Sequence, residues 1–177
     1  MHHAAVIVPI VNYAEPKIVF VRRAGHLRRN PGQIAFPGGI IDVEDGDDRA
    51  ITALREFEEE MGVPRERVRI VDRLDDVVTL ALSVTVTPYV GILEPPVAFR
   101  LDRSETDAFY EVELAALYAP GALRFGAEPV VRHGVTLAVP SWLFDFQDLH
   151  VWGATARMLR ALVERYGDLA SLPLQRA

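Results

Sequence analysis

The first part of the chain alternates apolar runs of strand length with short clusters of turn-forming residues. Ala4 to Val11 and Lys17 to Arg23 are apolar, β-rich runs, and the residues 12–16 between them are turn formers, so the two runs predict a hairpin. Further strand-like runs are Val68 to Leu74, Ser83 to Leu93, Val130 to Arg132 and Val135 to Val139. The last two flank His133-Gly134, a pair typical of a two-residue hairpin turn. Thr106 to Leu117 fits either a strand or a short helix.

Two segments have helical periodicity. The first begins at the N-cap candidates in Asp45 to Asp48, runs to Met61 and ends at Gly62, because Gly adopts the left-handed conformation that stops a helix. The second closes the chain over Leu149 to Tyr166, and its apolar side consists of Val151, Trp152, Thr155, Met158, Leu159 and Leu162. Strands and helices alternate without a regular βαβ rhythm, which favours an α+β layered sandwich over a doubly wound sheet.

Composition narrows the class of protein. A chain of 177 residues is close to the size of one domain of about 150 residues, so we expect a single domain over 1–177. The chain has no Cys, which excludes disulfides and thiolate metal sites and favours a cytoplasmic location. Its 19 Lys and Arg against 25 Asp and Glu leave a net charge of −6, which disfavours nucleic acids and membrane surfaces as partners. An anionic substrate would need local positive charge.

The first helix carries three glutamates on one side. At 100° per residue, Glu56, Glu59 and Glu60 fall within an arc of roughly 100°. Glu58 projects away from this arc, and Arg55 is spaced to pair with Glu59 at i+4. Carboxylates crowded on one face repel each other, and such oxygen ligands suit Mg²⁺ or Mn²⁺. A solvated acidic helix is the alternative for an E-x-x-E-E pattern taken alone.

The segment Arg55 to Val63 matches the R-E-U-x-E-E-x-G-U portion of the Nudix box, where U is a bulky apolar residue. The chain therefore resembles a Nudix hydrolase. The resemblance implies an α/β/α sandwich with a mixed central sheet and metal-assisted hydrolysis of a nucleoside diphosphate linked to another group. By position it gives Glu56, Glu59 and Glu60 the role of metal ligands and Arg55 that of their orienting partner. It also gives Gly39 a tight turn whose carbonyl can bind metal.

One part of the box departs from the family pattern. Fifteen residues separate Gly39 from Arg55, two more than the family spacing. We expect the insertion in Val43 to Asp48, a polar loop in which extra length costs little free energy. The first acidic position of the box then falls on Asp45 when counted from Gly39 and on Asp47 when counted from Arg55.

A basic stretch precedes the box. Arg23-Ala24, Arg28, Gly32 and Phe36-Pro37-Gly38-Gly39 reproduce the spacing R-[SA]-x3-R-x3-G-x3-F-P-G-G, which is similar to the extra motif of Nudix hydrolases that act on coenzyme A. Two breaker clusters this close predict a long ordered loop. Guanidinium groups bind phosphate bidentately, and we expect Arg23 and Arg28 to make the phosphate contacts. The implied substrate-binding residues are Arg23, Arg28, Gly32, Phe36 and Gly38.

The resulting hypothesis is a coenzyme A pyrophosphatase that uses Mg²⁺ or Mn²⁺ and yields 4′-phosphopantetheine and adenosine 3′,5′-bisphosphate. The general base is Glu59 or Glu105, the latter in the loop Ser104-Glu105-Thr106. One alternative is the same chemistry on another nucleoside diphosphate derivative, such as ADP-ribose or NADH. Another is a catalytically silent module that senses a nucleotide. A small nucleotide of the coenzyme A class is the expected partner, and the sequence leaves a homodimer open.

Overall fold

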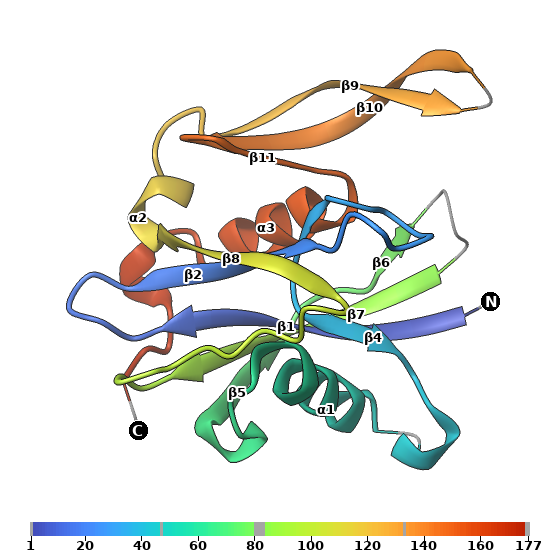
Figure 1. Ribbon diagram of the computed structural model, residues 1–177. Helices are drawn as coiled ribbons and strands as arrows, with labels where there is room; N and C mark the ends of the chain where they lie inside the picture. Colours follow the sequence, from blue (N-terminus) through green and yellow to red (C-terminus); the bar gives the residue numbers. More distant parts are fainter. Residues whose placement is uncertain (1, 47, 80–83, 133, 176–177) are drawn as a thin grey trace.

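A mixed β-sheet with a helix on each face forms the centre of the computed structural model, which describes residues 2–46, 48–79, 84–132 and 134–175 (Figure 1). The strands of this sheet are β1 (His2–Val11), β2 (Lys17–Arg23), β3 (Ile34–Ala35), β4 (Gly38–Ile40), β5 (Val68–Arg73), β6 (Val77–Thr79), β7 (Val84–Leu93) and β8 (Thr106–Glu113). The central order is β3-β2-β1-β7-β5, with β4 paired to β1, β6 to β7 and β8 to β2. β1 and β7 run parallel from the pair His2 and Val84 to the pair Val11 and Leu93, and the other pairs are antiparallel.

Both faces of the sheet are buried, which explains why β1 reads as a continuous apolar run. On one face, helix α1 (Arg49–Met61) buries Phe57 and Met61 against residues such as Ile7. On the other face, helix α3 (Gly153–Tyr166) buries Leu159 among the alternate residues of β1. The predicted α+β sandwich with a mixed central sheet is confirmed. In the described part of the chain, no helix is long and apolar enough to cross a membrane.

A second sheet covers the outer side of α3 (Figure 1). It consists of β9 (Leu123–Arg132), β10 (Val135–Phe146) and β11 (Leu149–Trp152) in the antiparallel order β11-β10-β9. A short helix, α2 (Leu114–Leu117), leads into it from β8. Short 3-10 helices lie at Val43–Asp45, Arg65–Arg67 and Leu169–Ser171.

The boundaries of three elements differ from the sequence prediction. The expected helix over Leu149 to Tyr166 starts only at Gly153, because residues 149–152 pair with β10 as strand β11. Leu149 and Val151 are buried and alternate with the exposed His150, a period of two that is typical of a strand. Thr106 to Leu117 is a strand followed by α2. The strands predicted over Val130 to Arg132 and Val135 to Val139 are present as β9 and β10, and both are longer than expected. His133 and Ser83 lie outside the described residues.

Both ends of α1 are capped as the sequence indicated. The Asp48 side chain accepts a hydrogen bond from the Ala50 N–H at 3.0 Å, and Gly62 adopts φ 64° with its N–H bonded to the Glu58 carbonyl. The chain after β7 returns to this end of the helix. There the Arg100 N–H donates to the Met61 carbonyl at 2.8 Å. A Cβ atom on Gly62 would lie 2.6 Å from the Arg100 carbonyl oxygen, so only glycine fits between the two segments.

Replacing Gly62 by alanine should therefore destabilise the fold more than the same change at Gly121. Both glycines have positive φ, 64° and 76°, but nothing lies within 4 Å of a Cβ at Gly121. The conformational cost of about 1 kcal/mol is common to both variants, and the overlap with Arg100 should add roughly 1–3 kcal/mol for Gly62→Ala. Urea denaturation of the two variants measures the difference. Equal losses of unfolding free energy would contradict the close approach.

Candidate functional site

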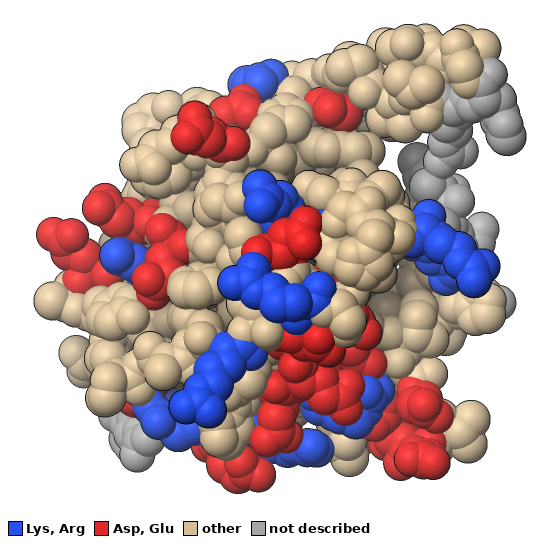
Figure 2. All heavy atoms as spheres, viewed as in Figure 1, with Lys and Arg blue, Asp and Glu red and all other residues tan. Residues whose placement is uncertain are grey.

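The solvent-facing side of α1 carries three carboxylates of graded exposure. Glu60 is only 4% exposed, while the side chains of Glu56 and Glu59 are 16% and 57% exposed. Figure 2 shows acidic side chains gathered over the position of α1, bordered by Lys and Arg side chains. Glu58 turns away and pairs with Arg65 at 2.6 Å, so it does not belong to this group, as the helical spacing predicted.

Arg55 forms ion pairs within the acidic face of α1, which consists of Glu56, Glu59 and Glu60. Its Nη1 lies 2.9 Å from Glu56 Oε1 and 3.0 Å from Glu59 Oε2, and the second contact is the predicted i,i+4 pair. Its Nε and Nη2 each donate to one oxygen of Asp45 at 2.9 Å. One guanidinium group thus contacts three carboxylates from two segments. The hydrogen bonds to Asp45, followed by the interaction with Glu56, raise the pKa of Arg55 above its ordinary value.

Asp45 is the acid of the lengthened loop that meets the helix. It lies in the 3-10 turn Val43–Asp45, and Oδ2 also accepts hydrogen bonds from Thr52 Oγ1 at 2.8 Å and the Asp42 N–H at 3.2 Å. The hydrogen bonds from Arg55 are the main reason that the pKa of Asp45 is well below its usual range. Of the two candidates for the first acidic position, Asp45 is thus the one that the structure describes, and it is paired with Arg55. Asp47, the other candidate, lies outside the described residues.

Glu105 belongs to a second segment, which interacts with Glu60 and Glu56 of α1. Burial, and then repulsion from Glu105, raise the pKa of Glu60 to about 8, whereas Arg23 and a 3.3 Å hydrogen bond from the Gly38 N–H act in the opposite direction. The pKa of Glu56 is also raised, first by burial and then by Glu59 and Glu105 against the effect of Arg55. The exposed Glu105 therefore lies within the electrostatic field of the helix carboxylates.

These carboxylates have the donor chemistry for a hard divalent cation. Among the residues that the structure describes, no three acidic or His side chains converge in a metal-binding arrangement. Arg55 holds Glu56 and Glu59, and the Gly38 N–H binds Glu60, so a cation would have to compete with these contacts. The crowding of like charges in a partly buried position nevertheless favours the uptake of positive charge.

Two glycines of β4 let the helix carboxylates approach the sheet. A Cβ at Gly39 would lie 2.3 Å from the Glu56 Cδ, so this carboxylate rests directly on the Gly39 backbone. Gly38 has φ 152°, and a Cβ there would lie 2.3 Å from the Ala5 carbonyl oxygen. Position 38 therefore requires glycine for steric reasons, whereas a side chain at Gly39 would displace the Glu56 carboxylate.

The basic loop, residues 23–33, begins at Arg23, next to the acidic face. The Arg23 carbonyl accepts from the Gly32 N–H and the Arg23 N–H donates to the Gln33 carbonyl, both at 3.0 Å, so the loop closes at its base. The Ala24 N–H donates to the Glu105 carbonyl at 2.8 Å, which ties the loop to the second acidic segment. Arg23 Nε is buried and has no hydrogen-bond partner among the described residues.

Arg28 and Phe36 occupy different environments from Arg23. Arg28 is exposed on the loop. Phe36, which was expected to contact substrate, lies in the hydrophobic core with 5% exposure and stacks on Phe20 at 5.2 Å between ring centroids. Phe36 therefore fixes the end of the loop to the hydrophobic core through its contact with Phe20.

Sequence reasoning missed two supporting residues. Thr52 binds Asp45, and the Asp102 N–H donates to the Glu60 carbonyl at 3.0 Å. The position of Thr52, seven residues after Asp45 on the inner side of α1, is a local signal that could have identified it. Nothing in the local sequence around Asp102 indicates that it meets the end of α1.

Comparisons with known proteins bear on the family and the fold of the chain. A family model described as NUDIX domain matches residues 1–133. The "Uncharacterized Nudix hydrolase NudL" of Salmonella newport is 37% identical over 164 residues, which cover 93% of this chain and 82% of the relative. The Nudix hydrolase RenU from M. smegmatis has a TM-score of 0.67 at 17% identity, covering 99% of this chain and 90% of that chain. A NUDIX hydrolase from Alicyclobacillus acidocaldarius has a TM-score of 0.52 at 21% identity, covering 93% and 91%. These two solved structures therefore share the fold of this chain.

Asp45→Asn should lower stability at neutral pH by roughly 1–3 kcal/mol, because it weakens the charge-assisted bonds to Arg55. The folded pKa of Asp45 lies below its unfolded value of about 3.9, so its stabilising effect is present above that pH and is lost as pH falls towards the folded pKa. The difference between the wild type and the variant should therefore shrink from pH 7 to pH 3.

Urea denaturation at the two pH values measures this difference. Glu44→Gln removes an exposed acid from the same turn and serves as the control. A constant difference across pH, or an equal effect of the control, would contradict the role of the Asp45–Arg55 pair.

Proposed function

Because the chain belongs to the Nudix family, we propose that it hydrolyses the diphosphate bond of coenzyme A to 4′-phosphopantetheine and adenosine 3′,5′-bisphosphate. The family membership gives Nudix pyrophosphohydrolase activity in general. The observation that carries the coenzyme A assignment is the basic loop, whose Arg23 interacts electrostatically with Glu60 and has a buried Nε without a hydrogen-bond partner in the described part of the chain. This loop has the spacing of the motif of Nudix hydrolases that act on coenzyme A.

The charge distribution supports a polyphosphate substrate. The protein has a net charge of −6 and a single Lys, so a phosphate group depends on nearby guanidinium groups for attraction. Arg23 and Arg28 are the residues proposed to bind the diphosphate. Gly32 and Gly38 shape the backbone that brings them to the acidic face, since Gly32 closes the loop on Arg23 and Gly38 bonds Glu60.

Glu56, Glu59, Glu60 and the Gly39 carbonyl are the groups proposed to hold Mg²⁺ or Mn²⁺. Hard oxygen ligands, partial burial and mutual repulsion all fit a divalent cation. Such an ion, when bound, lowers the pKa of the attacking water and stabilises negative charge on phosphoryl oxygens. Arg55 contributes by fixing the orientation of Glu56 and Glu59.

Two exposed carboxylates are suited to accept the proton of the attacking water. Glu59 is held by Arg55 at 3.0 Å, and Glu105 lies in the turn before β8, close enough to act electrostatically on Glu56 and Glu60. Glu60 is unsuited to this exchange because it is buried and bonded to the Gly38 N–H. The general base is therefore Glu59 or Glu105. We propose that Arg55 keeps Glu59 in position both as a cation ligand and as a candidate general base.

The substrate assignment predicts selective turnover. Incubation with coenzyme A, ADP-ribose or NADH, each with Mg²⁺ or Mn²⁺, should convert coenzyme A at least about tenfold faster than the other two. Chromatography resolves the two expected products, and a chelator should stop the reaction. Cleavage of ADP-ribose or NADH with coenzyme A left intact would favour the first alternative substrate class. Nucleotide binding without any turnover would favour a silent sensing module.

Neighbouring glutamates of α1 test the catalytic face. Glu59→Gln should reduce kcat by at least about 100-fold, because the amide cannot accept a proton or carry the negative charge that a cation needs. Glu58→Gln is the matched control, since Glu58 pairs with Arg65 away from the site. Its turnover should stay close to the wild type. Both variants should keep melting curves near the wild type, and full activity of Glu59→Gln would contradict the assignment.

A further inference from the structure

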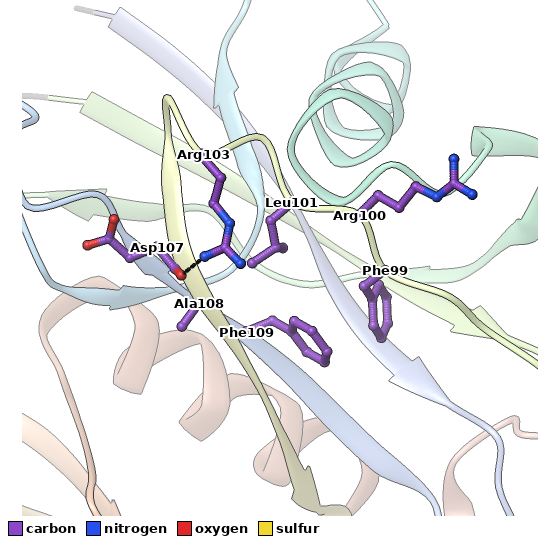
Figure 3. Close-up of a pocket in the computed structure, with 7 residues that line it drawn as sticks. All are labelled: Phe99, Arg100, Leu101, Arg103, Asp107, Ala108 and Phe109. Carbon is purple, nitrogen blue, oxygen red and sulfur yellow. Dashed lines mark hydrogen bonds between the residues drawn. The ribbon is translucent and has the colours of Figure 1, made fainter.

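An open pocket of about 440 Å³ lies between the chain that follows β7 and strand β8 (Figure 3). It is lined by residues 99–101 and 103, which follow β7, and by residues 107–109 of β8. Its volume falls within the range of about 300–1,000 Å³ that is typical of small-molecule sites. Neither the sequence motifs nor the proposed cation and diphosphate contacts account for this pocket.

The pocket is adjacent to the proposed site of hydrolysis. Arg103 and Asp107 are each two residues from Glu105, so their Cα atoms lie within about 7 Å of it, given at most about 3.6 Å per residue. The same segment is fixed to α1, because the Asp102 N–H donates to the Glu60 carbonyl at 3.0 Å. A substrate whose diphosphate lies at the carboxylates can therefore extend one of its ends into the pocket.

An aromatic pair provides an apolar surface in this pocket. The rings of Phe99 and Phe109 are 4.9 Å apart between centroids and tilted by 55°. Phe109 remains 38% exposed although it lies on the central sheet, so part of its ring is available to a ligand. An aromatic ring in this position suits the stacking of a nucleobase, which has a π face of its own.

Arg100 and Arg103 both line the pocket, and their side chains take different directions. Figure 3 shows the Arg103 side chain extending across the pocket, where Nη1 donates to the Asp107 carbonyl, whereas the guanidinium of Arg100 points away. The Asp107 carboxylate is turned outwards and accepts from the Gly25 N–H at 3.1 Å. Arg103 is therefore the charged group placed to bind an anion next to the aromatic pair.

We propose that this pocket binds the 3′-phosphoadenosine end of coenzyme A, with the adenine on Phe109 and the ribose 3′-phosphate on Arg103. The proposal rests on the coenzyme A assignment above and specifies how that substrate is oriented. The pantetheine end is uncharged and makes no use of a guanidinium, whereas the adenosine end combines an aromatic ring with a phosphate monoester. Arg103 thus distinguishes substrates with a 3′-phosphate from those without one.

A binding experiment tests the pocket independently of turnover. Calorimetric titration with adenosine 3′,5′-bisphosphate and with 5′-AMP should give about tenfold tighter binding of the bisphosphate to the wild type. Arg103→Ala should abolish this difference, and Arg103→Lys should restore part of it. Arg65→Ala, which removes a positive charge that pairs with Glu58 outside the pocket, should behave like the wild type. Phe109→Ala should weaken both ligands about tenfold through lost stacking.

Equal affinity of the wild type for the two nucleotides, or a preference that survives Arg103→Ala, would overturn the proposal. A turnover comparison separates its failure from that of the proposed function. Equal kcat/KM for coenzyme A and 3′-dephospho-coenzyme A would overturn the role of Arg103 while leaving the coenzyme A assignment intact. A preference for the bisphosphate in binding, combined with no hydrolysis of either coenzyme, would support the pocket and overturn the proposed function.

Discussion

The Arg55 guanidinium is the contact on which the acidic face depends. Two carboxylates about 4 Å apart repel each other by roughly 4 kcal/mol at an effective dielectric of about 20, so neighbouring glutamates on one side of a helix would separate without a cation between them. Arg55 offsets this repulsion through Glu56 and Glu59. Asp45 fixes the other edge of the guanidinium through Nε and Nη2. The lengthened loop before α1 therefore still delivers an acid to the place where Arg55 needs one.

The opposite side of α1 is equally important for the site. Phe57 and Met61 are fully buried against the central sheet, so the helix cannot roll and the glutamates keep their direction. The glycines of β4 allow this close docking, since any side chain at Gly39 would displace the Glu56 carboxylate. The apolar and acidic sides of one helix are thus coupled, because each fixes the rotation of the helix that the other requires.

Features that depend on local sequence could be predicted, and those that depend on distant contacts could not. The extent of α1 and the sides taken by Glu58 and Glu59 follow from caps and helical spacing. The start of α3 does not, because the apolar Leu149, Val151 and Trp152 also fit a helical pattern, and only their pairing with β10 makes this segment a strand. Counting residues leaves two positions for the first acid, and the contact with Arg55 favours Asp45, while Asp47 lies outside the described residues. The proposed metal ligands and substrate contacts stay predictions.

Glu60 connects the three segments that the proposed function requires. Its carboxylate accepts from Gly38 in β4, which follows the basic loop, and its carbonyl accepts from the Asp102 N–H in the segment that borders the pocket. Glu60 itself belongs to the acidic face. Small displacements between a cation, a diphosphate and a nucleobase site cost catalytic rate, so such sites need rigid mutual positions. A buried glutamate bonded through both its side chain and its backbone meets this need, which gives Glu60 a positioning role in addition to the ligand role proposed for its carboxylate.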